Sequence, residues 1–163
     1  MNSSAIIFRP IGVIHSEHEV PEKTPIQPVF AENCRGLAEI FPAFVSGLKD
    51  LEGFSHLYLI YHLHQAPPGK LIVKPFLQDV ERGIFATRAP PRPNAIGLSI
   101  VELILRQGNM LHVRGVDILD GTPILDIKPY SATFDHVKAT RSGWMDEVNG
   151  ETASQLGKRG YKS

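Results

Sequence analysis

The chain has 163 residues, a length that suits one domain with a buried core, and its 42% of hydrophobic residues is typical of a globular protein. Its 17 basic and 17 acidic side chains cancel, which argues against gripping nucleic acid through broad phosphate neutralisation. Any RNA contact must then use a local basic cluster, or two patches combined in a dimer. The single cysteine, Cys34, excludes an internal disulfide framework. With no membrane-length apolar run and no signal-peptide layout, the chain is expected to be cytoplasmic.

The first half of the chain predicts strands and one short helix. Residues 5–15 are rich in β-branched side chains and predict a strand bent at its proline. Residues 18–28 are polar and contain three prolines, which indicates an ordered loop. Residues 37–44 predict a strand, and residues 42–51 have apolar spacing compatible with a short helix. The clearest strand covers residues 54–64, where apolar and aromatic residues fill both faces in the middle.

The second half predicts short strands separated by turns. Residues 71–77 and 83–87 each favour a short strand. Residues 98–106 could be helical by composition, but a glycine-containing turn joins them to residues 110–118, which alternate. Two runs joined in this way are typical of a hairpin, so both are interpreted as strands. Asp-Gly-Thr-Pro at 120–123 is turn chemistry in which Gly121 supplies a positive φ.

Beyond residue 130 the composition becomes polar, and residues 145–155 predict a marginal helix. Many short strands with few helices predict a mostly-β fold, a single-sheet β-barrel with short helices and a polar C-terminal tail. We expect residues 1–130 to form this barrel domain and residues 131–163 to form a partly ordered extension. No GxGxxG follows a strand, so a dinucleotide-style cofactor loop is absent.

Residues 83–99, GIFATRAPPRPNAIGLS, are the most unusual stretch of the chain. Each of its three prolines fixes φ and pushes the preceding residue into extended geometry, so the segment is stiff. Stiffness would hold Arg88 and Arg92 in fixed positions, and a guanidinium matches a carboxylate or a phosphate with two parallel hydrogen bonds. The pattern alone slightly favours the alternative interpretation, a proline-rich edge connection whose arginines are solvated.

Three carboxylates, Asp117, Asp120 and Asp126, lie within ten residues around the second turn. They could perform acid–base chemistry, bind a hard cation or satisfy the turn itself. Because an aspartate before glycine most often satisfies its turn, Asp120 is interpreted as structural.

His62 and His64 form an H-x-H pair that could face one metal ion. No third ligand stands at a telling spacing, and pairs of this type are more often packing or hydrogen-bonding residues. A metal-dependent β-barrel enzyme nevertheless stays open as an alternative.

Four segments together resemble the TrmO-like family of S-adenosylmethionine-dependent tRNA (adenine N6) methyltransferases. They are IGVIHS (11–16), LEGFSHLYLIYHLHQ (51–65), ATRAPPRPNAIGLSIVEL (86–103) and DILDGTPILDIKPY (117–130), and the resemblance covers roughly residues 9–130. It implies a β-barrel that pairs into a homodimer, S-adenosyl-L-methionine as methyl donor, tRNA as substrate, and no metal. The implied reaction methylates the N6 nitrogen of threonylcarbamoyl-adenosine next to the anticodon.

The resemblance also implies roles for individual residues. The cofactor pocket would comprise Gln27, Pro28, Val29, His64, Gln65, Arg88, Leu98, Pro123, Ile124, Leu125 and Asp126. Asp126 or Asp117 is the candidate general base. The candidates for RNA contact are Arg82, Arg92, Lys128 and Tyr130, although solvated charge for Arg82 and rim packing for Tyr130 remain open. Longer relatives carry a further domain, so substrate recognition that depends on it is not carried over. A non-catalytic RNA- or nucleotide-binding barrel is the second alternative.

Overall fold

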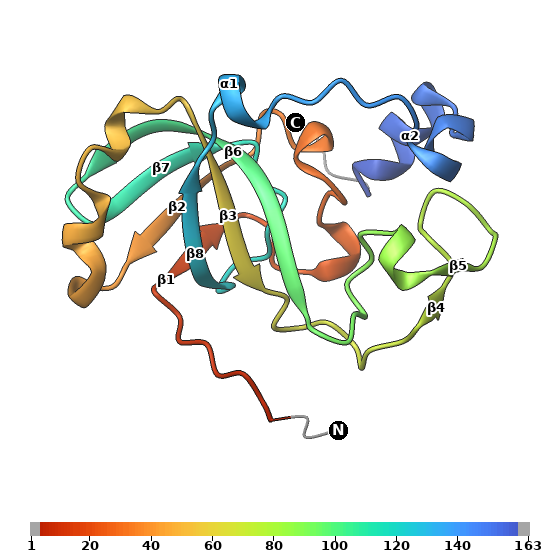
Figure 1. Ribbon diagram of the computed structural model, residues 1–163, viewed down its shortest axis with the longest axis horizontal. Helices are drawn as coiled ribbons and strands as arrows, with labels where there is room; N and C mark the ends of the chain where they lie inside the picture. Colours follow the sequence, from red (N-terminus) through yellow and green to blue (C-terminus); the bar gives the residue numbers. More distant parts are fainter. Residues whose placement is uncertain (1–3, 160–163) are drawn as a thin grey trace.

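Six antiparallel strands close into a barrel in a computed structural model that describes residues 4–159 (Figure 1). Their order around the barrel is β1-β2-β7-β6-β3-β8. The bounds are β1 (Gly12–Ser16), β2 (Arg35–Ile40), β3 (His56–His62), β6 (Ile96–Gln107), β7 (Met110–Arg114) and β8 (Pro123–Pro129). The predicted mostly-β fold with a single-sheet barrel and short helices is confirmed.

Strand β6 shows why this sequence forms a barrel wall. Gly97, Ser99 and Val101 alternate with exposed Leu98 and Ile100, so the buried side chains all share one face of the strand. That face joins apolar residues from the other strands in a continuous core. Burying one Val, Leu or Ile side chain there stabilises the fold by about 1.5–3 kcal/mol.

Two glycine turns set the positions of the neighbouring strands. Gly108, with φ of 61°, closes the hairpin in which Gln107 of β6 pairs with Met110 of β7. Gly121, with φ of 75°, makes the turn that leads into β8. Both turns were expected from the sequence and are confirmed.

Short elements and a small second sheet lie outside the barrel. The 3-10 helices are η1 (Pro21–Lys23), η2 (Pro28–Phe30), η3 (Pro42–Leu48), η4 (Leu51–Gly53), η5 (Ile84–Ala86) and η6 (Gly143–Glu147). The α-helices are α1 (Ala132–Asp135) and α2 (Gly150–Gly157), and the small sheet pairs β4 (Ile72–Val73) with β5 (Arg82–Gly83). No helix within residues 4–159 is long and apolar enough to cross a bilayer.

The predicted strand at residues 83–87 is wrong, because most of it forms η5. The backbone N–H and the hydroxyl of Thr87 both donate to the carbonyl of Ile84, at 3.1 and 2.9 Å, and close a turn instead of a ladder. The strand expected at 5–15 begins only at Gly12, where pairing with β2 and β8 starts. Its neighbour Pro10 has no N–H to donate to a ladder.

The strands expected at 37–44 and 71–77 are shorter, being Arg35–Ile40 and Ile72–Val73, since prolines follow each of them. The helix expected at 42–51 is present as the 3-10 helix η3, and the helix expected at 145–155 corresponds to α2, Gly150–Gly157.

The polar tail folds back over the loops beside the barrel (Figure 1). The indole N–H of Trp144 donates to the carbonyl of Ala86 at 2.8 Å, and the carbonyl of Gly157 accepts from the N–H of Ile26 at 3.0 Å. Gly157 also has no Cβ, which leaves room for the Phe30 ring. The extension is thus packed against the rest of the chain up to residue 159, while residues 160–163 lie outside the described range.

Candidate functional site

The proline-rich segment is held together by one of its own arginines. Nη1 of Arg92 donates to the carbonyls of Ile84, Thr87 and Ala89, at 3.2, 2.8 and 3.4 Å. Its guanidinium also lies 6.0 Å from the centre of the Phe85 ring. One nitrogen of the Arg92 guanidinium therefore fixes the shape of the segment. The contact of Arg92 with an RNA phosphate, expected from the sequence, stays a prediction.

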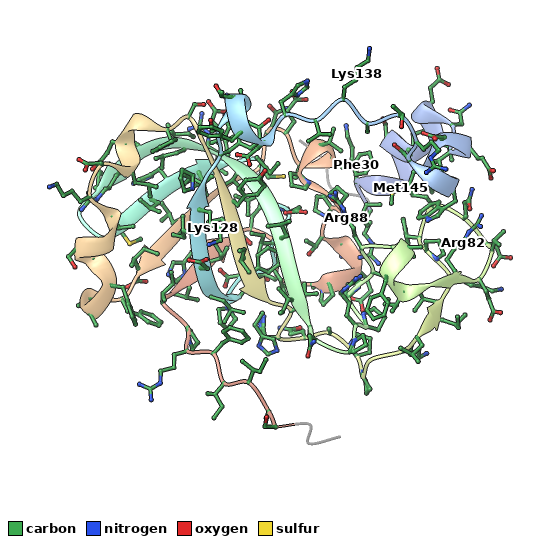
Figure 2. The ribbon with its side chains drawn as sticks, viewed as in Figure 1. Phe30, Arg82, Arg88, Lys128, Lys138 and Met145 are labelled. Carbon is green, nitrogen blue, oxygen red and sulfur yellow. The ribbon has the colours of Figure 1, made fainter. Side chains whose placement is uncertain are left out.

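Arg88 projects from this fixed segment toward the polar loop before β2. Its Nη1 donates to Oε1 of Gln27 at 2.6 Å, and Gln27 is the N-cap residue of η2. Figure 2 labels Arg88 to the right of β6, on the side of the molecule where the tail lies. Two segments that are 61 residues apart in the sequence thus meet, as the resemblance implies for Gln27, Pro28 and Arg88.

A chain of three polar side chains lies at the same end of the barrel. The hydroxyls of Tyr61 on β3 and Ser99 on β6 are 2.9 Å apart, and the Ser99 hydroxyl donates to Oδ1 of Asp117 at 2.6 Å. Tyr61 and Ser99 are only 6% and 1% exposed. The Asp117 carboxyl is surrounded by protein although its residue remains partly accessible.

The electrostatics of this cluster centre on Asp117. Burial raises the pKa of its carboxyl to about 7, even though the Ser99 hydroxyl, its own backbone N–H and the positive charge of Arg88 each lower it. Burial, and next the charge of Asp117, raise the pKa of the Tyr61 phenol, so Tyr61 keeps its proton. A carboxyl that titrates near neutrality can accept a proton from a substrate and release it again.

His64 reaches the start of β8. Its Nδ1 lies 3.3 Å from the hydroxyl of Thr122, which donates to the carbonyl of Leu119 at 2.7 Å and can therefore accept from an Nδ1–H. Burial and then His62 lower the pKa of His64. This contact places His64 beside Pro123, as the predicted cofactor pocket requires.

Asp126 and Asp120 have simpler surroundings. Asp126 forms an ion pair with Lys128 at 2.9 Å near the surface, and its Oδ1 accepts the N–H of Ile127 at 2.9 Å. Asp120 accepts the N–H of Ser16 at 2.9 Å, in keeping with its expected structural role. Of the two candidate bases, Asp117 is the one whose carboxyl is surrounded by protein and acted on by the charge of Arg88.

Other predicted residues are spread over the molecule. Leu98 is 54% exposed on the outer face of β6, Val29 is 73% exposed, and Gln65 is exposed after β3, whereas Ile124 is fully buried in the core. Leu125 is half-buried on β8.

The four residues expected to contact RNA do not form one patch. In Figure 2, Arg82 lies at the right edge of the molecule, whereas Lys128 lies on β8 in the barrel. Arg82 donates to Gln78 at 2.9 Å and lies over the Trp144 ring, while Tyr130 contacts the Tyr58 ring at the far end of β8.

Sequence reasoning missed Tyr61 and Ser99 as site residues. Tyr61 is buried in the core, as an aromatic residue in the middle of a strand would be, but its hydroxyl has a polar partner. The signal for Ser99 was available, because it is a hydroxyl on the inward face of an otherwise apolar strand. A buried polar group implies a hydrogen-bond partner.

Within residues 4–159, no three or more His, Cys, Asp and Glu side chains are grouped so that they could hold a metal ion. His62 is exposed and His64 contacts Thr122. The alternative of a metal site at these histidines therefore gains no third ligand from the described part of the chain.

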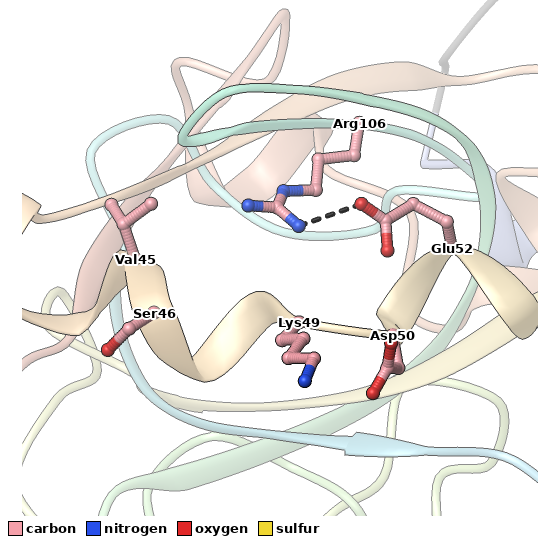
Figure 3. A pocket seen from close by; sticks show the side chains of 6 residues that line it. All are labelled: Val45, Ser46, Lys49, Asp50, Glu52 and Arg106. Atoms are coloured by element: carbon pink, nitrogen blue, oxygen red, sulfur yellow. Dashed lines mark hydrogen bonds and ion pairs between the residues drawn. The ribbon is translucent and has the colours of Figure 1, made fainter.

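The opposite end of the barrel carries a separate, open pocket of about 520 Å³. Figure 3 shows Arg106 and Glu52 together along one side of it, and they are joined at 2.7 Å. Arg106 also donates to the carbonyls of Leu48 and Gly108. Its hydrogen bonds are thus directed to the protein itself.

Comparisons with known proteins bear on this arrangement. The model of the tRNA-methyltransferase O N-terminal domain matches residues 13–136. A probable S-adenosyl-L-methionine-binding protein of Pyrococcus abyssi is 52% identical over 142 residues, covering 87% of this chain and 77% of that protein. The mouse tRNA (adenine(37)-N6)-methyltransferase is 36% identical over 144 residues, covering 83% of this chain and 33% of the mouse protein.

A crystal structure of TrmO from Pseudomonas aeruginosa superimposes with a TM-score of 0.71 at 39% identity, covering 86% of this chain and 62% of that one. The chain therefore spans less than two thirds of that crystal structure and about a third of the mouse protein. The matched domain, the barrel and the identities agree, and the chain belongs to the TrmO family.

Proposed function

We propose that this protein is an S-adenosylmethionine-dependent tRNA methyltransferase that methylates N6 of threonylcarbamoyl-adenosine next to the anticodon. Membership of the TrmO family supports the reaction, and relatives named as tRNA (adenine(37)-N6)-methyltransferases support the substrate. The observation that carries the proposal is that Arg88 joins Gln27 at 2.6 Å while its charge acts on the Asp117 carboxyl, which the Ser99 hydroxyl holds at 2.6 Å. We also propose that the protein is cytoplasmic, because its proposed substrate is a tRNA.

The residues at this end fit S-adenosylmethionine. The exposed Arg88 guanidinium suits the carboxylate of its amino-acid part. The Asp117 carboxylate, when ionised, favours a positively charged sulfonium nearby. Backbone groups of Pro123, Ile124 and Leu125, beside His64, would read the adenine. When bound there, S-adenosylmethionine supplies a methyl group from its positively charged sulfur, and the rest of the molecule is left as a neutral thioether.

The protein's task is then to position the reactants and to move one proton. The N6 nitrogen is a poor nucleophile, because its carbamoyl substituent withdraws electrons. We assign the general base to Asp117 rather than Asp126, whose carboxylate is already paired with Lys128. Asp117 takes the N6 proton as the nitrogen–methyl bond forms, and becomes a neutral carboxylic acid. Its burial raises its pKa, which suits both the gain and the later loss of that proton.

A homodimer is part of the proposal. The outer face of β6 exposes Ile96, Leu98 and Ile100 to 41%, 54% and 39%, an apolar strip that a second copy would cover. Arg82, Arg92, Lys128 and Tyr130 remain candidates for tRNA contact, and two copies would combine their separate patches. Light scattering after gel filtration measures the assembly, and a monomer at micromolar concentration would contradict it.

Mass spectrometry of threonylcarbamoyl-modified tRNA tests the proposed reaction. Incubation with protein and S-adenosylmethionine should add one methyl group to the modified adenosine, and tRNA lacking the threonylcarbamoyl group is the control. Binding of tRNA with no change in mass would instead support a non-catalytic binding barrel.

A further inference from the structure

We propose that Tyr61 and Ser99 are positioning residues that hold the Asp117 carboxylate, through a one-way hydrogen-bond relay, as the proton acceptor beside Arg88. The inference rests on the proposed function. It adds two residues that touch neither the cofactor nor the RNA in the scheme above.

The direction of the relay follows from counting protons. Ser99 has one hydroxyl hydrogen, and it is donated to Oδ1 of Asp117 at 2.6 Å. The 2.9 Å contact between the Tyr61 and Ser99 hydroxyls must then be a donation from Tyr61. The relay therefore ends on an acceptor, and it favours the ionised form of Asp117.

The barrel is shaped to hold this relay. Tyr61 on β3 lies opposite Gly97 on β6, and a Cβ at residue 97 would overlap the Tyr61 ring. Glycine therefore leaves room for the ring against β6, where its hydroxyl contacts Ser99, two residues further along. Asp117 comes from the segment between β7 and β8, so three parts of the chain meet at one carboxyl.

The relay leaves Asp117 with capacity for a substrate. Oδ1 is occupied by Ser99, and the carboxylate has further lone pairs for an incoming N–H. The charged and titratable groups that act on it are Arg88 from the proline-rich segment and Tyr61 from β3. If the two hydroxyls only satisfied each other as buried polar groups, their removal would lower stability and leave the Asp117 titration unchanged.

The first measurement follows the Asp117 carboxyl carbon by NMR as pH changes. Ser99→Ala removes a hydrogen bond that favours the ionised form, so the titration midpoint should rise by about one pH unit. Tyr61→Phe should shift it in the same direction by less, and Ser99→Thr should restore it. Asn109→Ala is the control, because it removes a hydrogen bond to the Ile40 carbonyl at the other end of the barrel. Its midpoint should match the wild type.

The second measurement is the pH profile of methyl transfer, kcat/KM, in the same variants. The acidic limb of Ser99→Ala should move to higher pH by the same amount, with partial recovery of rate above the limb. A uniform loss of rate at every pH, with an unmoved NMR midpoint, would overturn the relay. Should Ser99→Ala fail to fold, Tyr61→Phe and Ser99→Thr carry the same comparison. A wild-type protein that transfers no methyl group while the NMR midpoints shift as expected would overturn the proposed function but leave the relay standing.

Discussion

An arginine and a carboxylate act on each other near each end of strand β6, but the pKa of the carboxylate is shifted in opposite directions at the two ends. At the far end, Arg106 pairs with Glu52 at 2.7 Å, and Glu52's own backbone N–H and then Arg106 lower the pKa of that exposed carboxylate. At the near end, burial raises the pKa of the Asp117 carboxyl to about 7, although the positive charge of Arg88 lowers it.

The two arginines differ in how many of their hydrogen-bond donors are already used by the protein. Arg106 is committed to Glu52 and two carbonyls, whereas Arg88 has one hydrogen bond to Gln27 and remains exposed. A solvated ion pair of the first kind contributes little to stability or chemistry. A buried carboxyl beside an available guanidinium is the arrangement that binds an anion and moves a proton.

The largest expected effect of breaking this contrast is on catalysis. Asp117→Asn should lower methyl transfer at least about 100-fold, since a general base contributes that much or more. Mass spectrometry of modified tRNA over time gives the rate. Glu52→Gln, at the other end of β6, is the matched control and should keep the wild-type rate. Asp126→Asn should cost less than Asp117→Asn, and equal losses would contradict the choice of base.

The next effect is on cofactor affinity. Arg88→Ala should weaken S-adenosylmethionine binding about 10-fold or more, because charge-assisted hydrogen bonds to a carboxylate are lost. Isothermal titration calorimetry measures this, with Arg106→Ala as the control at the far end. Unchanged affinity in Arg88→Ala would remove this residue from the site.

A third effect concerns stability and pH. Asp117 has a folded pKa of about 7 against an ordinary value of 3.8, so the folded state binds the extra proton between these values. Its contribution to stability therefore falls as pH rises through that range. The difference in unfolding free energy between Asp117→Asn and the wild type should therefore shift in favour of the variant by about 1–3 kcal/mol from about pH 5 to about pH 8. Urea unfolding at both pH values checks it, and parallel pH dependence in the two proteins would speak against burial of the charge.

The last effect is on stability alone and concerns the packing beneath Tyr61. Gly97→Ala should destabilise the protein by about 1–3 kcal/mol, because the new methyl group overlaps the Tyr61 ring. Gly47→Ala, where a Cβ would meet nothing within 4 Å, should change the melting temperature little. Equal melting temperatures for the two variants would mean that the ring does not need the space at residue 97.

Local signals allowed much of the fold to be predicted from the sequence. The β6–β7 hairpin and the Gly121 turn follow from alternation and positive-φ glycines within a few residues. The strand expected at 83–87 failed for an equally local reason, since Thr87 caps Ile84 and diverts the backbone from a ladder.

The site was harder to predict because its contacts are distant in the sequence. The family motifs pointed to Arg88 and Gln27, which do meet. Tyr61 and Ser99 are 38 residues apart, and only the barrel register brings their hydroxyls together. The sequence pattern alone could not show whether Arg92 would bond to its own segment or to a phosphate.

The most direct test of the account is an NMR titration of the full chain with S-adenosylmethionine, observing the side-chain signals of Arg88, Asp117, Arg106 and Glu52 together. We predict that the Arg88 guanidinium and the Asp117 carboxyl shift with one common dissociation constant, while Arg106 and Glu52 stay unchanged. Saturable binding that leaves both Arg88 and Asp117 unperturbed would contradict a methyl-transfer site at this end of the barrel.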